Sequence, residues 1–169
     1  MLAEEEFPRK EKQLPKSLTS LPIEILWVLK NYKAFKKVAF TLRKYPEAVV
    51  CTADDDCIYD RNYAEELYNK WIEFGKQKCC IKYVDDPHIC FLGPCMLYYG
   101  INFPVEGLTE YQINKSFDDT WMWKYAKANR IPILTCNKKE VPFKIHNDND
   151  PLHPTFGSEI MQSIQHVDL

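Results

Sequence analysis

The stretch EAVVCTADDD, residues 47–56, is the strongest indication of the fold class of this chain. Its apolar part, from Val49 to Ala53, predicts a short buried strand. A continuous apolar run of this length is typical of a strand in a parallel sheet that helices cover on both faces. Three aspartates close the strand, and ligands bind open α/β folds at the carboxyl edge of the sheet. The stretch therefore predicts a layered α/β fold with an acidic site at one edge of its sheet.

The three adjacent carboxylates repel one another unless a cation or hydrogen-bond donors neutralise them. Oxygen ligands in a cluster suit Mg²⁺ or Mn²⁺, which bind one or two carboxylates while also holding substrate phosphates. We therefore expect Asp54, Asp55 and Asp56 to face a metal-bound diphosphate. A solvated acidic turn is the alternative, because short acidic motifs also occur by chance.

A second acidic element, Asp118-Asp119, lies in the first turn of a helical stretch that is predicted to open at Ser116 and to run to Asn129. Acids in a first helical turn are stabilised by the helix dipole and by free backbone N–H groups, so helix capping is one interpretation. Trp121 follows closely and is expected either in the core or as a surface on which a sugar stacks. A carboxylate beside such a ring has restricted access to water, and a raised pKa suits it to general-base catalysis.

Several motifs recur in a shared order: LAEEEFP (2–8), YKAFKK (32–37), RKYP (43–46), the acidic triplet, GPCMLYY (93–99), DDTW (118–121) and Asn149-Asp150. In this order and spacing they resemble the bacterial nucleotide-sugar glycosyltransferases of the GT-A type, especially those of capsule and lipopolysaccharide synthesis. The resemblance covers most of the chain. It implies one GT-A domain over residues 1–169, a Rossmann-like layered sheet with helices on both faces.

The implied activity is metal-dependent transfer of a sugar from a nucleotide-sugar donor to a saccharide or lipid-linked saccharide acceptor, with Mn²⁺ or Mg²⁺ as cofactor. In this resemblance Asp119 takes the proton of the attacking hydroxyl and Asp118 stands beside it. The remaining implied roles are metal binding by Asp56, Asp54 and His146, nucleotide or diphosphate binding by Asp54, Asp55, Lys36 and Lys37, and acceptor binding by Gly93, Tyr98 and Trp121. Read without the resemblance, the lysines form a solvated helix face and His146 lies in a surface loop.

The chain also departs from the family pattern. It begins just after the strand, helix and strand that would hold the base, so we expect a domain truncated at its N-terminus. Pro94 and Cys95 stand where a glycine-rich segment is usual, and Tyr99 stands where proline is expected. The alternative function is therefore a non-catalytic remnant with residual metal or carbohydrate binding.

Composition agrees with one compact unit: 169 residues are 46% hydrophobic and carry a formal charge of -2. A domain of this size buries enough surface for a real core. No basic stripe indicates nucleic-acid binding. The longest apolar run, residues 23–29, is far shorter than the ~20 residues of a membrane helix. We expect a cytoplasmic protein without a transmembrane segment, with peripheral membrane association left open.

The seven cysteines contain no Cys-x-x-Cys pair, which favours small core residues over a zinc site. Apolar spacing predicts helices over 34–44 and 63–74 and a closing helix over 159–166. Short strands are expected near 79–84, 89–92 and 131–136.

Overall fold

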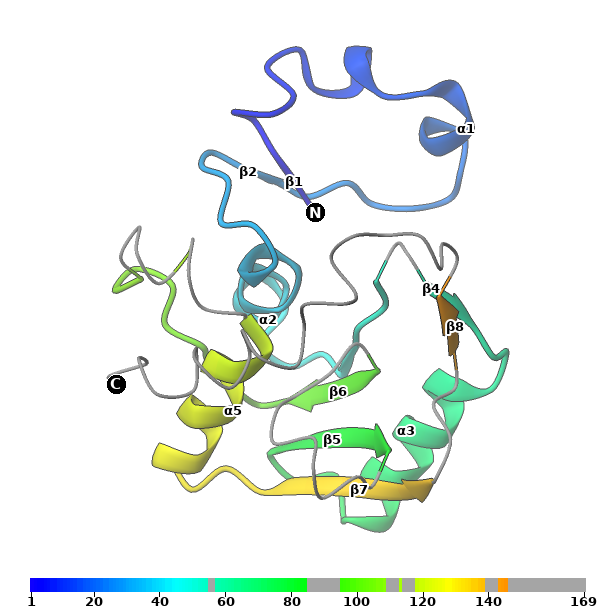
Figure 1. Cartoon of the computed structure of the whole chain (residues 1–169), viewed down its shortest axis with the longest axis vertical. Helices are drawn as coiled ribbons and strands as arrows, with labels where there is room; N and C mark the ends of the chain where they lie inside the picture. Colours follow the sequence, from blue (N-terminus) through cyan, green and yellow to red (C-terminus); the bar gives the residue numbers. More distant parts are fainter. Residues whose placement is uncertain (55–56, 85–94, 109–112, 114–117, 139–142, 146–169) are drawn as a thin grey trace.

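The structure is a computed structural model that describes residues 1–54, 57–84, 95–108, 113, 118–138 and 143–145. Within these ranges the chain is a mixed α/β protein (Figure 1). Its elements are β1 (Leu2–Ala3), η1 (Lys10–Gln13), α1 (Lys16–Thr19), β2 (Trp27–Val28), η2 (Lys36–Phe40), α2 (Thr41–Lys44), β3 (Val50–Cys51), β4 (Cys57–Tyr59), α3 (Tyr63–Glu73), β5 (Cys79–Val84), β6 (Met96–Tyr99), α5 (Asp118–Ala128), β7 (Ile133–Lys138) and β8 (Phe143–Ile145).

The central sheet has four strands in the order β3-β6-β5-β7. Strands β5 and β7 are parallel, whereas β6 runs antiparallel to both of its neighbours, β3 and β5. The expectation of a parallel partner for the strand before the acidic triplet was therefore wrong, since Val50 pairs with Tyr98 in an antiparallel register. A continuous apolar run indicates that both faces of a strand are buried. It does not indicate whether the neighbouring strand runs parallel or antiparallel.

Helices cover the sheet on both faces. Successive side chains of a strand point to opposite sides, so neighbouring residues of β6 pack against different helices. On one face, Met96 and Tyr98 pack with η2, α2 and α5. On the other face, Cys95 and Leu97 pack with α3 through Leu67 and Trp71. In Figure 1, α5 and α3 accordingly lie on either side of the β6, β5 and β7 strands.

The segments predicted to be helical over 34–44 and 63–74 are helical, whereas the helix predicted over 159–166 and the strand predicted near 89–92 lie outside the described residues. Helix α3 buries Leu67 and Trp71, four residues apart, and ends before Gly75, whose φ of +78° suits a glycine that terminates a helix. The segment expected to be helical over 34–44 is a π-helical turn, η2, followed by the α-helical turn α2. A π turn is rare and is frequently found at functional sites.

The first 33 residues wrap above the sheet as a loop-rich unit joined by two short parallel strands, β1 and β2 (Figure 1). Leu2 and Ala3 of β1 pair with Trp27 and Val28 of β2. Ala3 and Val28 are buried, so the beginning of the chain contributes to a packed core.

A second antiparallel ribbon joins β4 and β8, with Cys57 paired to Ile145 and Tyr59 to Phe143. No helix within the described ranges has the length and apolar character needed to cross a bilayer.

Candidate functional site: one lysine between two acidic motifs

Lys37 lies between the two acidic motifs. Its Nζ is 2.9 Å from Oδ1 of Asp54 and 3.4 Å from Oδ2 of Asp118. These two aspartates belong to motifs that are far apart in the sequence, one after β3 and the other at the start of α5. The π turn η2 carries Lys37 and buries its neighbours Val38 and Ala39 in the core. The fold therefore brings the first residue of the acidic triplet and the first residue of the Asp118-Asp119 pair to one ammonium group.

Asp54 is held by the end of the strand that precedes it. The backbone N–H of Thr52 donates to the carbonyl of Met96 at 2.9 Å, which continues the β3–β6 pairing by one residue. The Met96 N–H donates in turn to the buried Thr52 hydroxyl at 3.3 Å. The backbone N–H of Asp54 donates to the Tyr59 hydroxyl at 2.7 Å. These contacts fix the backbone of Asp54, so that its carboxylate faces Lys37.

The first turn of α5 presents buried oxygens that have no hydrogen-bond partner. They are Oδ2 of Asp118, Oδ1 of Asp119 and Oγ1 of Thr120. Asp118 is 6% exposed and Thr120 is 1% exposed, whereas Asp119 is partly buried as a whole residue but has its Oδ1 fully enclosed. An enclosed oxygen without a partner costs free energy. Oδ2 of Asp118 has the Lys37 ammonium as an ion-pair partner at 3.4 Å, so Oδ1 of Asp119 and Oγ1 of Thr120 are the atoms expected to serve a ligand rather than the fold.

Burial raises the pKa of both carboxyl groups above their usual range. For Asp118 the nearby Lys37 opposes the effect of burial, while Asp54 adds to it. For Asp119 burial is the largest cause and the neighbouring Asp118 carboxylate is the next, so its pKa is raised further. Of the two, Asp118 has the direct cationic partner and Asp119 has the stronger tendency to hold a proton.

The charge of Lys37 is stabilised by all three carboxylates. Burial by itself lowers the pKa of Lys37, but Asp118, Asp119 and Asp54 outweigh burial and raise that pKa well above its usual range. The cluster also includes Tyr98, a fully buried residue of β6. Burial, followed by the charge of Asp119, raises the pKa of the Tyr98 hydroxyl. Tyr98 therefore stays neutral beside the carboxylates.

The donor chemistry of this cluster suits a hard cation, because its oxygens come from carboxylates and Oδ1 of Asp119 is enclosed without a partner. The position between Asp54 and Asp118 is held by the Lys37 ammonium. Among the described residues, no three histidine, cysteine, aspartate or glutamate side chains converge as metal ligands. A metal bound by Asp54 would therefore need further ligands from outside the described part of the chain.

The β4–β8 ribbon bears on this requirement. Strand β4 begins at Cys57, directly after the acidic triplet, and β8 ends at Ile145, directly before His146. Cys57 and Ile145 are paired in the antiparallel register. The chain thus enters β4 and leaves β8 at the same end of the ribbon.

The other residues predicted for the site are placed differently. Lys36 is directed to Oε2 of Glu6 at 3.0 Å and to Oδ1 of Asn31 at 2.9 Å. Trp121 is 4% exposed and its ring contacts Phe35, Phe103 and Tyr125, which confirms its interpretation as a core residue. An acceptor role for Trp121 or Tyr98 stays a prediction. Four further predicted residues lie outside the described part of the chain: Asp55, Asp56, Gly93 and His146.

Two residues of the site escaped the sequence analysis. Thr120 follows the acid pair and buries its hydroxyl without a partner, and its place in the first helical turn was the available signal. Tyr59 accepts the hydrogen bond from the backbone of Asp54, and nothing in the sequence around it indicates this contact.

Comparison of the chain with models of protein families and with curated proteins finds no match.

Proposed function

We propose that this chain is a metal-dependent glycosyltransferase of the GT-A type, which moves a sugar from a nucleotide-sugar donor to a saccharide acceptor. The observation that carries the proposal is the shared contact of Asp54 and Asp118 with Lys37. The resemblance assigns the first motif to the donor and the second to the acceptor. A transferase needs both substrates in one cleft, and the two motifs meet at a single side chain.

Asp54, with Asp55 and Asp56, would hold the divalent cation, and His146 would complete its shell. The pairing of Cys57 with Ile145 supports this set, because the segments next to Asp56 and His146 leave the ribbon at the same end. Bound Mn²⁺ or Mg²⁺ would neutralise charge on the departing diphosphate. Lys37 would add a second positive charge beside that diphosphate, a fixed donor where negative charge develops.

Asp119 is the proposed general base. Its enclosed Oδ1 has no protein partner, so the oxygen is free to accept the proton of an acceptor hydroxyl. Its raised pKa makes it a better proton acceptor than an ordinary surface aspartate. Lys37 opposes the rise that burial causes in the pKa of Asp118, and Asp118 would orient the acceptor or the base.

The second candidate is a non-catalytic relative that retains metal or carbohydrate binding. One observation favours it: the Lys37 ammonium already neutralises Asp54, which lowers the need for a metal cation at this carboxylate. The two candidates differ in turnover and agree in fold.

Donor binding is the first test. A thermal-shift screen of the full chain with UDP-, GDP-, CMP- and dTDP-sugars should show one nucleotide class that raises the melting temperature only with Mn²⁺, because ligands that bind the folded state stabilise it. Asp54→Asn should abolish that shift. Asp60→Asn is the matched control, since Asp60 is an exposed aspartate after β4 and should leave the shift unchanged. If no nucleotide sugar shifts the wild-type chain, the transferase proposal is wrong.

Turnover is the second test, measured as release of nucleoside diphosphate in the presence of candidate saccharides. Asp119→Asn should lower turnover by ~10²-fold or more while the donor dissociation constant stays within about twofold. Donor binding by the wild-type chain with no release for any acceptor would favour the non-catalytic candidate. Equal losses of binding and turnover in Asp119→Asn would assign the residue to the structure of the helix start.

A further inference from the structure

Lys37 is a single cation that two carboxylates share. Its Nζ donates a hydrogen bond to Oδ1 of Asp54 at 2.9 Å and lies 3.4 Å from Oδ2 of Asp118. Both oxygens are within ion-pair distance of the same ammonium group. A rotation of the lysine side chain therefore shortens one contact at the expense of the other, without any movement of the backbone.

The backbone that carries Lys37 is fixed on both sides of the residue. Val38 and Ala39, which follow it in η2, are 0% and 1% exposed and belong to the core. Lys36, which precedes it, donates to Oε2 of Glu6 at 3.0 Å. The Lys37 side chain itself is 28% exposed, so it is less tightly enclosed than its neighbours in the core. The part of η2 that is able to move is the lysine side chain.

The carboxylates of the cluster exceed its cation. Lys37 balances the charge of one carboxylate, but it contacts two, Asp54 and Asp118. Two further oxygens in the first turn of α5, Oδ1 of Asp119 and Oγ1 of Thr120, are enclosed without a hydrogen-bond partner. Oxygens in excess over positive charge favour the binding of another cation. A divalent cation at Asp54 would repel the Lys37 ammonium beside it, and this repulsion is strong at a site that is partly shielded from water.

We propose that Lys37 is a positioning residue that exchanges with the divalent cation: it leaves Asp54 when the cation binds there and moves fully onto Asp118. The inference rests on the metal site proposed for Asp54, and it does not depend on sugar transfer. The exchange links the two acidic motifs, because Asp118 holds the ammonium alone only when Asp54 holds the cation. By thermodynamic linkage, a stronger contact of Lys37 with Asp118 raises the affinity of Asp54 for the cation.

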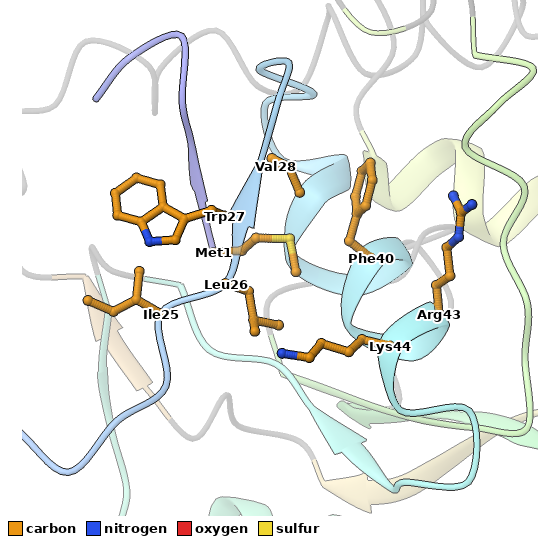
Figure 2. Close-up of a pocket in the computed structure, with 8 residues that line it drawn as sticks. All are labelled: Met1, Ile25, Leu26, Trp27, Val28, Phe40, Arg43 and Lys44. Atoms are coloured by element: carbon orange, nitrogen blue, oxygen red, sulfur yellow. The ribbon is translucent and has the colours of Figure 1, made fainter. Parts of the chain in front are cut away.

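A pocket beside η2 and α2 does not suit a cation. Phe40, Arg43 and Lys44 line it on one side and β2 lines it on the other, around a volume of about 370 Å³ (Figure 2). Its lining residues include two basic side chains and no acidic one. This pocket is therefore expected to repel Mn²⁺, and variants of Lys37 should change cation binding only on the side of η2 that meets the acidic motifs.

Binding of Mn²⁺ alone, without nucleotide, tests the exchange, and the paramagnetic resonance signal of free Mn²⁺ measures it. Lys37→Met should raise the affinity of the full chain for Mn²⁺ by about tenfold or more, because it removes the competing cation. Lys37→Arg keeps the charge and should remain within about threefold of the wild type. The matched control is Lys36→Met, which removes a lysine that contacts Glu6 and Asn31 instead of Asp54 and should leave the affinity within about twofold.

Asp118 separates the exchange from direct ligation of the metal. Asp118→Asn takes away the carboxylate that receives Lys37, so it should lower the Mn²⁺ affinity by about tenfold in the wild type and by about threefold or less in Lys37→Met. Equal losses in the two backgrounds would make Asp118 an ordinary ligand or a distant charge and would overturn the exchange. Asp54→Asn should abolish the gain in Lys37→Met. A gain that persists would place the cation elsewhere and would also overturn it.

Urea denaturation of each variant establishes that it is folded before Mn²⁺ is added. Lys37→Gln keeps a hydrogen-bond donor for Asp54 without the positive charge, and it should show the same gain as Lys37→Met. It takes the place of Lys37→Met in every comparison if that variant does not fold.

Failure of this inference can be told from failure of the transferase proposal. If the wild type and Lys37→Met bind Mn²⁺ equally, or if neither binds it, the exchange is wrong even where a nucleotide sugar raises the melting temperature. If no nucleotide sugar does so, the transferase proposal is wrong, while a gain of about tenfold in Lys37→Met that requires Asp54 still supports the exchange.

Discussion

The two faces of the central sheet differ in how they treat polar groups. On the α3 face, the buried cluster is apolar and its tyrosine is satisfied, since the Tyr83 hydroxyl donates to Glu66 at 2.6 Å. On the α5 face, among the described residues, lie all three buried side-chain oxygens without a hydrogen-bond partner. The α3 face is therefore built for stability. On the α5 face, buried oxygens without hydrogen bonds lower the stability of the fold, which is expected of a surface that binds a ligand.

The largest expected effect is on the α3 face. Leu67→Ala should lower the free energy of unfolding by about 3 kcal/mol or more, because Leu67 is fully buried between α3 and the sheet and its truncation leaves a cavity. Urea denaturation measures the loss. Tyr68→Ala on the exposed side of the same helix is the control and should cost far less. The Mn²⁺-dependent thermal shift by the donor should remain, and its disappearance would show that the two faces are coupled.

On the α5 face, Lys37→Met should lower the free energy of unfolding by about 2 to 3 kcal/mol, because it leaves two carboxylates without their cation. The value lies below that of a fully buried pair since the Lys37 side chain is 28% exposed. Urea denaturation at neutral pH provides the measurement. Lys37→Arg, which keeps the charge, should recover most of the stability. A loss below about 0.5 kcal/mol in Lys37→Met would reduce the cluster to a solvated ion pair.

For the two faces of the sheet, the sequence predicts the features that depend on the spacing of residues along one helix. Leu67 and Trp71 are four residues apart, so they lie on one side of a helix whatever packs against it, and α3 was predicted within a residue of its observed ends. The helix that carries the acid pair was also predicted, over 116–129 against the observed Asp118–Ala128, because Asp118 and Asp119 favour a first turn.

The rest depends on tertiary structure, which the sequence spacing does not contain. The run from Val49 to Ala53 indicates burial, yet the antiparallel direction of β6 beside it follows from how distant segments pack. Lys36 and Lys37 look equivalent in the sequence, but neighbouring side chains on a helical segment point in different directions. Only the packing of η2 on the sheet determines which of them meets Asp54.

A smaller effect of opposite sign is expected at Asp119. Asp119→Asn should raise the free energy of unfolding at neutral pH by about 1 kcal/mol, since it removes a carboxylate that is enclosed beside Asp118. The pKa of Asp119 is raised on folding, so the folded state holds the proton more tightly than the unfolded state. The contribution of Asp119 to the free energy of unfolding of the wild type therefore falls as the pH rises above about 4, the pKa of an aspartate in the unfolded chain.

The gain in Asp119→Asn should accordingly be absent near pH 4 and grow toward neutral pH, as measured by urea midpoints across that range. Destabilisation of equal size at every pH would mean that the carboxylate makes a structural hydrogen bond. Thr120→Val offers a comparison without charge, because it removes the adjacent orphan hydroxyl and should show no dependence on pH.

The smallest effect is expected at the neighbouring lysine. Lys36→Met removes the contacts to Glu6 and Asn31. The Lys36 side chain is 17% exposed, but Glu6 is 42% exposed, so water replaces the lysine at that carboxylate. The free energy of unfolding should fall by less than about 0.5 kcal/mol. The same substitution at Lys37, one residue further, is expected to cost several times more, and the two urea titrations form a matched pair on one turn of helix. If Lys36→Met and Lys37→Met lower the free energy of unfolding equally, burial around the acidic motifs does not strengthen the Lys37 contacts. Water then reaches the unsatisfied oxygens of α5, and these oxygens are no evidence of a ligand site.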